Sequence, residues 1–160
     1  PPTPVGGTAV DVLRRQLRQA SDLLVLSIDD TAQKLAPRAG QMIQALTDQR
    51  WVGVSFTHTG DASVVDGVAR QPMPYVQLPP GDRDLVAFGF QLAIVEAVSA
   101  AGNPMPLVLD RVLDAWPADK APLLVRALQF AGNGTQVICL TQRRELAAAG
   151  AVVTVQQAPA

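Results

Sequence analysis

The sequence is poor in the residues that build disulfide frameworks and metal centres. It contains one cysteine, Cys139, and one histidine, His58, among 160 residues. A disulfide inside the chain is therefore excluded, and one cysteine with one histidine cannot build a conventional structural zinc site. We expect the protein to work in a reducing compartment such as the cytoplasm.

An excess of charge of one sign and long hydrophobic runs are also absent. Thirteen basic and fourteen acidic residues leave a net charge of -1, and aromatic residues make up only 4%. This composition, with no basic run interleaved with aromatics, does not support binding to nucleic acid or anionic lipid. No apolar run approaches the roughly 20 residues that span a bilayer, and no charged-then-apolar signal segment opens the sequence. We therefore expect no membrane partner.

What the sequence does contain is enough apolar material for a core. Hydrophobic residues make up 48% and charged residues 17%, and the length fits one domain of about 150 residues. Residues 1–7 are rich in Pro and Gly and are predicted to be a flexible linker, typical of a piece of a longer polypeptide. Residues 8–160 are predicted to form a single α/β domain, with a helical segment over 8–47, a hairpin and loop over 48–80, and a C-terminal lobe over 81–160.

The segment 8–47 has the apolar spacing of two helices. The first stripe comprises Val10, Leu13, Leu17, Ala20 and Leu24, and the second comprises Ile28, Ala32, Leu35, Ala39, Met42 and Leu46. We expect Pro37 to kink or split the second helix, because proline lacks an amide donor. Two interpretations remain open: two core helices, or the end of a coiled coil that reaches a globular head.

A change to alternating hydrophobicity after Thr47 predicts a β-hairpin. Residues 51–56 and 62–65 are the expected strands, and His58–Asp61 supply the turn. We expect His58 to be an exposed turn residue without a catalytic role, because no second histidine and no cysteine nucleophile is near it in the sequence. Residues 72–80 are predicted to be a Pro-rich connection.

The second half of the sequence predicts a strand–helix–strand unit after a long helix. Residues 81–101 are apolar over almost the whole helical circumference, so we expect a buried helix. Residues 107–110 and 136–141 are apolar without alternation, which predicts a parallel pair covered on both faces. The remaining expected elements are a helix over about 118–131, a short helix over 143–149 and a strand over 152–155.

Both of these predicted strands end in polar residues. Asp110 ends the first strand, and Thr141 and Gln142 end the second. In open parallel sheets, ligands bind beyond the carboxyl ends of the strands. We therefore expect the Asp110 carboxylate and the Gln142 amide at the same edge.

Three short motifs follow one another in this half. They are Leu78-Pro79-Pro80-Gly81-Asp82, Leu107-Val108-Leu109-Asp110-Arg111 and Val137-Ile138-Cys139-Leu140-Thr141-Gln142. Their order and spacing resemble the C-terminal lobe of the ABC-type ATPase heads of the SMC and DNA-repair class. That family carries a Leu-Ser-Gly-Gly-(Gln/Glu) signature loop, a Walker B strand ending in Asp-Glu, and a strand ending in a switch histidine.

The resemblance covers about Thr8 to Val155 and implies a fold. The expected fold is a three-layer, P-loop-NTPase-like half domain with a parallel sheet, N-terminal helices and a small β-hairpin. The alternative is an unrelated three-layer domain with one strand–helix–strand unit. By resemblance, the nucleotide-binding positions would be Gly81, Asp110 and Gln142, and Asp110 would hold magnesium through water.

The matching positions depart from the family in their chemistry. Pro79 and Pro80 stand where the signature serine and the next residue would be, and proline has no N–H for a phosphate. Asp82 adds a repelling charge to this loop. Arg111 stands where the family has the glutamate that polarises the attacking water, and a guanidinium cannot act as that base. Gln142 replaces the switch histidine.

Two further positions of the resemblance bear on the function. Asp114 lies near the family's D-loop, whose aspartate position Pro117 alternatively occupies. No Gly-x-x-x-x-Gly-Lys-(Ser/Thr) P-loop is present in the sequence. The family carries that loop in an N-terminal lobe, so we expect no cofactor in isolation, and Mg-ATP only together with an upstream lobe.

These departures predict a catalytically degenerate head lobe, and therefore no catalytic residue. Such a lobe would serve as a scaffold or a dimerisation domain, pairing with itself, with an ATPase head or with an upstream lobe of the same polypeptide. One alternative is half of an active ATP-hydrolysing head. Another is a small-ligand-binding α/β domain with a pocket at the strand ends.

Overall fold

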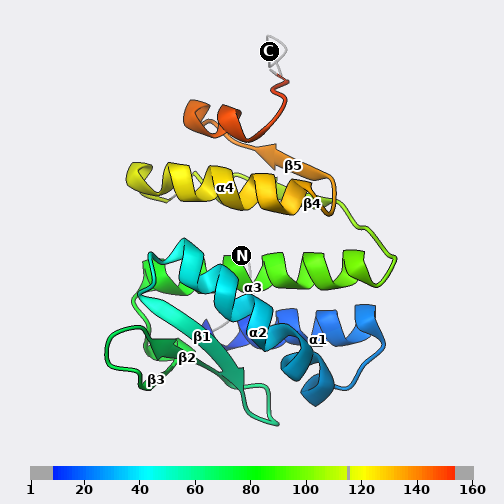
Figure 1. The fold of residues 1–160 in the computed structure, drawn as a ribbon, viewed down its shortest axis with the longest axis vertical. Helices are drawn as coiled ribbons and strands as arrows, with labels where there is room; N and C mark the ends of the chain where they lie inside the picture. The colour runs from blue at the N-terminus through cyan, green and yellow to red at the C-terminus, as the bar shows by residue number, and fades with distance from the viewer. Residues whose placement is uncertain (1–8, 115, 154–160) are drawn as a thin grey trace, which may run out of the picture. The chain divides into compact units, whose positions relative to one another are not determined.

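The computed structural model describes residues 9–114 and 116–153 (Figure 1). The chain forms two compact units, a first unit over Pro1–Met105 and a second unit over Pro106–Ala160. The long helix that we expected to open the C-terminal lobe therefore belongs to the same unit as the hairpin and the N-terminal helices. That 8–160 form a single domain stays a prediction.

Two helices open the first unit, as the apolar spacing predicts. They are α1 (Ala9–Leu24) and α2 (Ile28–Leu46), and Ser27 caps α2 by accepting a hydrogen bond from the amide of Asp30 at 3.1 Å. Most described members of both apolar stripes are buried in the core of this unit, whereas Leu24 and Ile28 are half-buried. The side chain of Val10 lies outside the described residues, and the coiled-coil interpretation stays a prediction.

Pro37 lies inside α2, which runs through it from Ile28 to Leu46. The expectation that Pro37 splits this helix is therefore wrong. Proline leaves the carbonyl of Gln33 without its helical donor, but both residues are exposed, so water can hydrate that carbonyl. Buried residues on the opposite side, such as Leu35 and Ala39, keep the helix in place.

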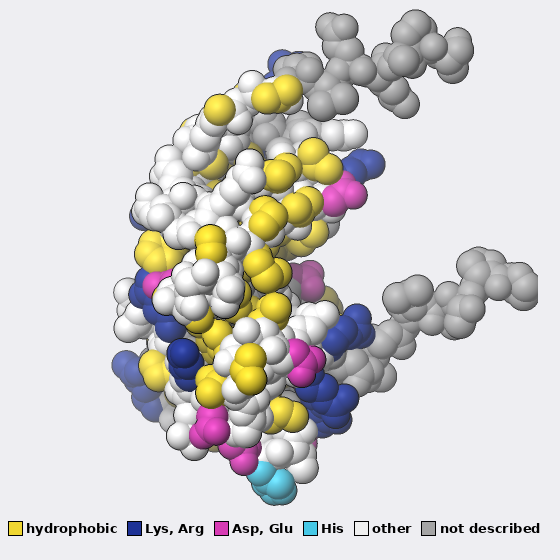
Figure 2. Space-filling model, turned by 90° about the vertical axis from the view of Figure 1, so that its right-hand side faces the viewer, with side chains coloured by type: hydrophobic (Ala, Val, Ile, Leu, Met, Phe, Trp, Pro, Cys, Tyr) yellow, Lys and Arg dark blue, Asp and Glu magenta, His cyan; other side chains and the backbone are white. Residues whose placement is uncertain are grey.

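The first unit contains a three-stranded antiparallel sheet in the order β1-β2-β3. Its strands are β1 (Trp51–Phe56), β2 (Ala62–Asp66) and β3 (Pro72–Pro74). The predicted hairpin is confirmed, and His58 is exposed in its turn, where its ring is the cyan side chain of Figure 2. Strand β3 was not predicted, because two prolines favour a connection; this short strand tolerates them at the edge of the sheet.

Helix α2 packs against both β1 and the long helix α3 (Pro80–Ala100), and glycines allow the close approach. A Cβ atom on Gly40 would lie 3.3 Å from the Cα of Gly53, and one on Gly89 would lie 2.9 Å from Ile43 Cγ1. The predicted burial of α3 is confirmed, because most of its central side chains are buried. No helix among the described residues is both long and apolar enough to cross a membrane.

The second unit contains the predicted strand–helix–strand arrangement. Strands β4 (Leu107–Asp110) and β5 (Val137–Leu140) pair in parallel, and α4 (Ala121–Gly132) lies between them in sequence. The 3-10 helix η2 (Ala118–Lys120) precedes α4, and the 3-10 helix η3 (Arg144–Ala149) follows β5 where we expected a short helix. Val152 and Val153 are not in a strand, which corrects that part of the last prediction; residues 154–155 lie outside the described residues.

Among the described residues, the two faces of the parallel pair differ in exposure. Leu107 and Leu109 are 6% and 5% exposed, whereas Val108, Ile138 and Leu140 on the other face are 56%, 40% and 47% exposed. The expectation of a sheet covered on both faces is therefore wrong for this unit. Apolar residues on both faces predict burial on both, but Val108, Ile138 and Leu140 on one face are exposed.

Candidate functional site

The loop that we matched to the signature motif is built as a proline-led helix start. Leu78 is buried, and Pro79 and Pro80 are exposed. Proline is favoured in the first turn of a helix, because its missing N–H would have no partner there. The first helical bond is donated by the amide of Arg83 to the carbonyl of Pro79 at 3.0 Å. Gly81 faces open space, since nothing lies within 4 Å of an added Cβ.

Tyr75 forms a hydrogen bond to the first turn of α3. Its hydroxyl donates a hydrogen bond to the carbonyl of Arg83 at 3.2 Å, and burial raises the pKa of Tyr75 to about 12. The phenol is therefore a neutral donor at physiological pH. Its contact adds to the packing of Leu78 in holding the loop.

The carboxylate of Asp82 is held by two neighbours from the start of β1. Trp51 donates its indole N–H to Asp82 Oδ2 at 3.1 Å, and Arg50 Nη1 lies 3.2 Å from the same oxygen. The Arg50 guanidinium also lies 5.4 Å from the Trp51 ring centre. A carboxylate suits the positive end of the α3 dipole. Sequence reasoning placed Asp82 in the loop but missed both partners, which are distant in sequence.

Asp110 ends β4 as predicted, and its side chain is exposed. It pairs in register with Leu140, and the next residue, Arg111, donates its amide to the Leu140 carbonyl at 2.8 Å. Arg111 adopts a left-handed backbone conformation, with φ 56°. Across residues 9–114 and 116–153, no three side chains of His, Cys, Asp or Glu come together as a metal site would require.

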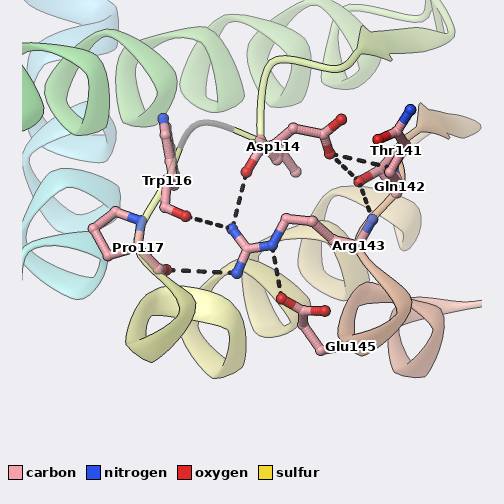
Figure 3. Close-up of polar contacts among 8 residues, drawn as sticks. Asp114, Trp116, Pro117, Thr141, Gln142, Arg143 and Glu145 are labelled. Atoms are coloured by element: carbon pink, nitrogen blue, oxygen red, sulfur yellow. Dashed lines mark hydrogen bonds and ion pairs between the residues drawn. The ribbon is translucent and has the colours of Figure 1, made fainter.

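The acidic side chain that contacts the end of β5 is Asp114 (Figure 3). It accepts a hydrogen bond from the hydroxyl of Thr141 and one from the amide of Gln142 at 3.4 Å, and Arg111 Nε lies 3.5 Å from its other oxygen. The Thr141 hydrogen bond is the main cause that holds the pKa of Asp114 below its usual value of 3.8. The sequence singled out Asp110 for this edge, and Asp114 only by its place near the D-loop.

Arg143 is the most heavily bonded side chain of this edge, and sequence reasoning missed it. Its guanidinium donates to the carbonyls of Leu113 and Trp116, both at 2.9 Å, and to that of Pro117 at 3.5 Å. It also donates to Glu145 at 2.8 Å, as Figure 3 shows. The side chain is only 9% exposed. No local pattern in the sequence marks a side chain that bonds backbone carbonyls so far away.

Comparison with known proteins identifies the fold. No protein-family model matches the chain, and no curated protein matches it. Among solved structures, it is similar to an Smc head bound to the C-winged helix domain of ScpA, with 11% identity and a TM-score of 0.68 over 89% of this chain and 48% of the other. The SMC head domain of Thermotoga maritima matches with 19% identity and a TM-score of 0.56, over 84% of this chain and 45% of that one. The chain has the fold of part of an SMC head.

A third similar structure agrees. The Smc head with a coiled coil and joint from Pyrococcus yayanosii matches with 14% identity and a TM-score of 0.61, over 78% of this chain and 24% of the other. The predicted mixed α/β, ATPase-head-like fold is confirmed. The chain spans about half the length of the first two heads, or less. At these identities the similarity establishes the fold but not the activity.

Proposed function

We propose that this chain is an SMC-type head lobe that does not hydrolyse ATP and serves as a scaffold for protein interaction. The observation that carries the proposal is Arg111, which follows Asp110 at the end of β4. The resemblance places the water-polarising glutamate at this position. A guanidinium stays protonated near neutral pH and cannot accept a proton from water. The position therefore lacks the general base that hydrolysis needs.

The start of α3 also fits a phosphate poorly. A phosphate at a helix N-terminus is held by free backbone N–H groups, and Pro79 and Pro80 have none. Asp82 already places a negative charge at this terminus, where Trp51 and Arg50 hold it. A phosphate there would be repelled by this carboxylate. The start of α3 thus has its own carboxylate, paired with Trp51 and Arg50, in place of donors that could bind a phosphate.

The remaining positions do not make up for these losses. Asp110 is exposed and offers a carboxylate, and Gln142 offers an amide without charge. Neither of these two side chains supplies a cation for the terminal phosphate. The residues of this chain thus fit Mg-ATP poorly.

The uncovered face of the second unit supports the scaffold role. Val108, Ile138 and Leu140 present apolar side chains to solvent beside one another on the parallel pair, and hydrophobic groups reach the surface of this unit (Figure 2). Parallel sheets are normally covered on both faces, and a two-stranded sheet is marginal alone. Because the chain spans 48% and 45% of two solved heads, we infer that the other half of such a head covers this face. A similar head is bound to a domain of ScpA, which supports pairing with proteins in general.

Calorimetry with Mg-ATP and light scattering test the two parts of the proposal separately. We expect no saturable heat when Mg-ATP is added to the chain alone, and no magnesium-dependent ATP turnover when the chain is assembled with the polypeptide that supplies the other half of the head. We expect Ile138→Lys to abolish association with the polypeptide that supplies the other half of the head, while Val68→Lys, at a position 93% exposed in the first unit, leaves it unchanged. Saturable Mg-ATP binding that Asp110→Ala removes would favour an active half-head instead. Equal effects of the two lysine variants would reject the β4–β5 face as the interface.

A further inference from the structure

The residues that follow β4 and those that follow β5 are joined by one largely buried cation. The Arg143 guanidinium donates to the carbonyls of Leu113, Trp116 and Pro117, which all follow β4, while Arg143 itself follows β5. Three carbonyls on one guanidinium make use of its fixed fork of donors. A charged donor also forms stronger hydrogen bonds than a neutral one.

Because the Arg143 side chain is largely buried, loss of its hydrogen bonds would be energetically costly. The Arg143 side chain is 9% exposed, and Glu145 at 2.8 Å provides its countercharge. A buried guanidinium that lost these acceptors would be strongly unfavourable, and so would the carbonyls it left unpaired. Loss of either the guanidinium or its carbonyl acceptors would therefore destabilise this contact.

A second link runs parallel to the first. The amide of Arg143 donates to the hydroxyl of Thr141 at 3.0 Å, and that hydroxyl donates onward to Asp114. The Thr141 hydroxyl thus accepts one hydrogen bond, from Arg143, and donates another, to Asp114. Backbone and side chain of Arg143 together connect β5 to the residues after β4, and every group in this connection belongs to the chain itself.

We propose that Arg143 is a positioning residue whose guanidinium, rather than a bound ligand, fixes the residues after β4 against those after β5. The inference deepens the proposed function, since a scaffold without nucleotide needs this edge to keep one arrangement in the absence of ligand. Pre-organisation of this kind lowers the ordering cost of binding a partner. The role is local, because the strands themselves are paired by their own backbone ladder.

Amide hydrogen exchange on the full chain tests this role, with Arg143→Gln compared with wild type and with Arg144→Gln, a neighbouring exposed arginine. We expect the amides of Asp114 and Trp116 to lose protection at least tenfold in Arg143→Gln. The amides of Ile138 and Leu140 should change by less than threefold, and Arg144→Gln should change neither set. Arg143→Lys should retain only part of the protection, because an ammonium lacks the planar fork. Added ethylguanidinium should restore protection in Arg143→Ala.

Three outcomes would overturn the proposal. One is unchanged exchange at Asp114 and Trp116 in Arg143→Gln, and another is an equal loss throughout the second unit, which would indicate a general stability role. The third is a rise in protection of wild-type Asp114 and Trp116 on adding Mg-ATP. If Arg143→Gln does not fold, Arg143→Lys and the wild-type nucleotide titration decide. ATP turnover would contradict the proposed function but would leave the result of the Arg143 exchange comparison standing.

Discussion

The hydroxyl of Thr141 donates a hydrogen bond to the carboxylate of Asp114, across 27 positions of sequence. The contact joins the end of β5 to the residues after β4, at the edge where parallel sheets bind ligands. In this chain the Thr141 hydroxyl, the Asp114 carboxylate and the Arg143 amide bond one another at that edge. The carboxylate at the centre is Asp114, and Asp110, the expected ligand, lies exposed at the end of β4.

Acid should weaken this contact, and Asp114→Asn should remove that part of the acid response. The pKa of Asp114 is lowered from 3.8 in the folded state, chiefly by Thr141. Its contribution to the free energy of unfolding is therefore present above pH 3.8 and is lost as the pH falls through the lowered value. Urea unfolding of the second unit at pH 7 and pH 3 measures this difference.

We expect the difference between the two pH values to be smaller in Asp114→Asn than in wild type. Some difference should remain, because the pKa of Glu145, which lies in the same unit, is also lowered. The exposed Asp119→Asn serves as the matched control and should behave as wild type. An identical pH response in Asp114→Asn and wild type would show that this carboxylate has no part in the acid sensitivity.

Trp51→Phe should destabilise the first unit by about 2 kcal/mol. Trp51 is 1% exposed, so the smaller ring leaves a void, and Asp82 loses its indole donor. Asp82→Asn should cost less, under about 1 kcal/mol, because Arg50 is largely exposed and the amide still accepts from the indole. Chemical denaturation gives both values. A larger loss in Asp82→Asn than in Trp51→Phe would contradict the assigned contacts.

Gly89→Ala should destabilise the first unit by about 1–3 kcal/mol, although alanine favours helices. The new methyl group would lie 2.9 Å from Ile43 Cγ1 and 3.1 Å from the Ile43 amide nitrogen, so α2 and α3 would have to separate. Gly81→Ala in the same helix is the control, since no atom lies within 4 Å of its added Cβ. Its melting temperature should be unchanged or slightly higher. Equal melting temperatures for both variants would contradict the close packing of α2 on α3.

Local patterns predicted the elements of this fold well, because their signals lie within short stretches. The three-and-four spacing located α1 and α2, and the alternation after Thr47 located β1 and β2. The expectation that Pro37 splits α2 was wrong, because the cost of proline in a helix depends on whether water reaches the freed carbonyl. The coverage of the β4–β5 face could not be predicted, since apolar residues on a strand do not specify which segment covers them.

The candidate site was predicted only in outline. The sequence located the strand ends and the proline-led start of α3, because these follow from residue types in order. It did not locate the links of Asp82 to Trp51 or of Arg143 to Leu113, which join positions far apart in the chain. Such contacts depend on the folded geometry and leave no periodic trace in the sequence.

Steady-state ATP turnover distinguishes a head lobe that does not hydrolyse ATP from half of an active head. The protein, assembled with the polypeptide that supplies the other half of the head, is assayed with and without magnesium, alongside Asp110→Ala and the control Asp119→Ala. We predict no magnesium-dependent turnover above background in any of these proteins. Turnover in wild type and Asp119→Ala that falls in Asp110→Ala would contradict it and would establish this chain as half of a working ATPase.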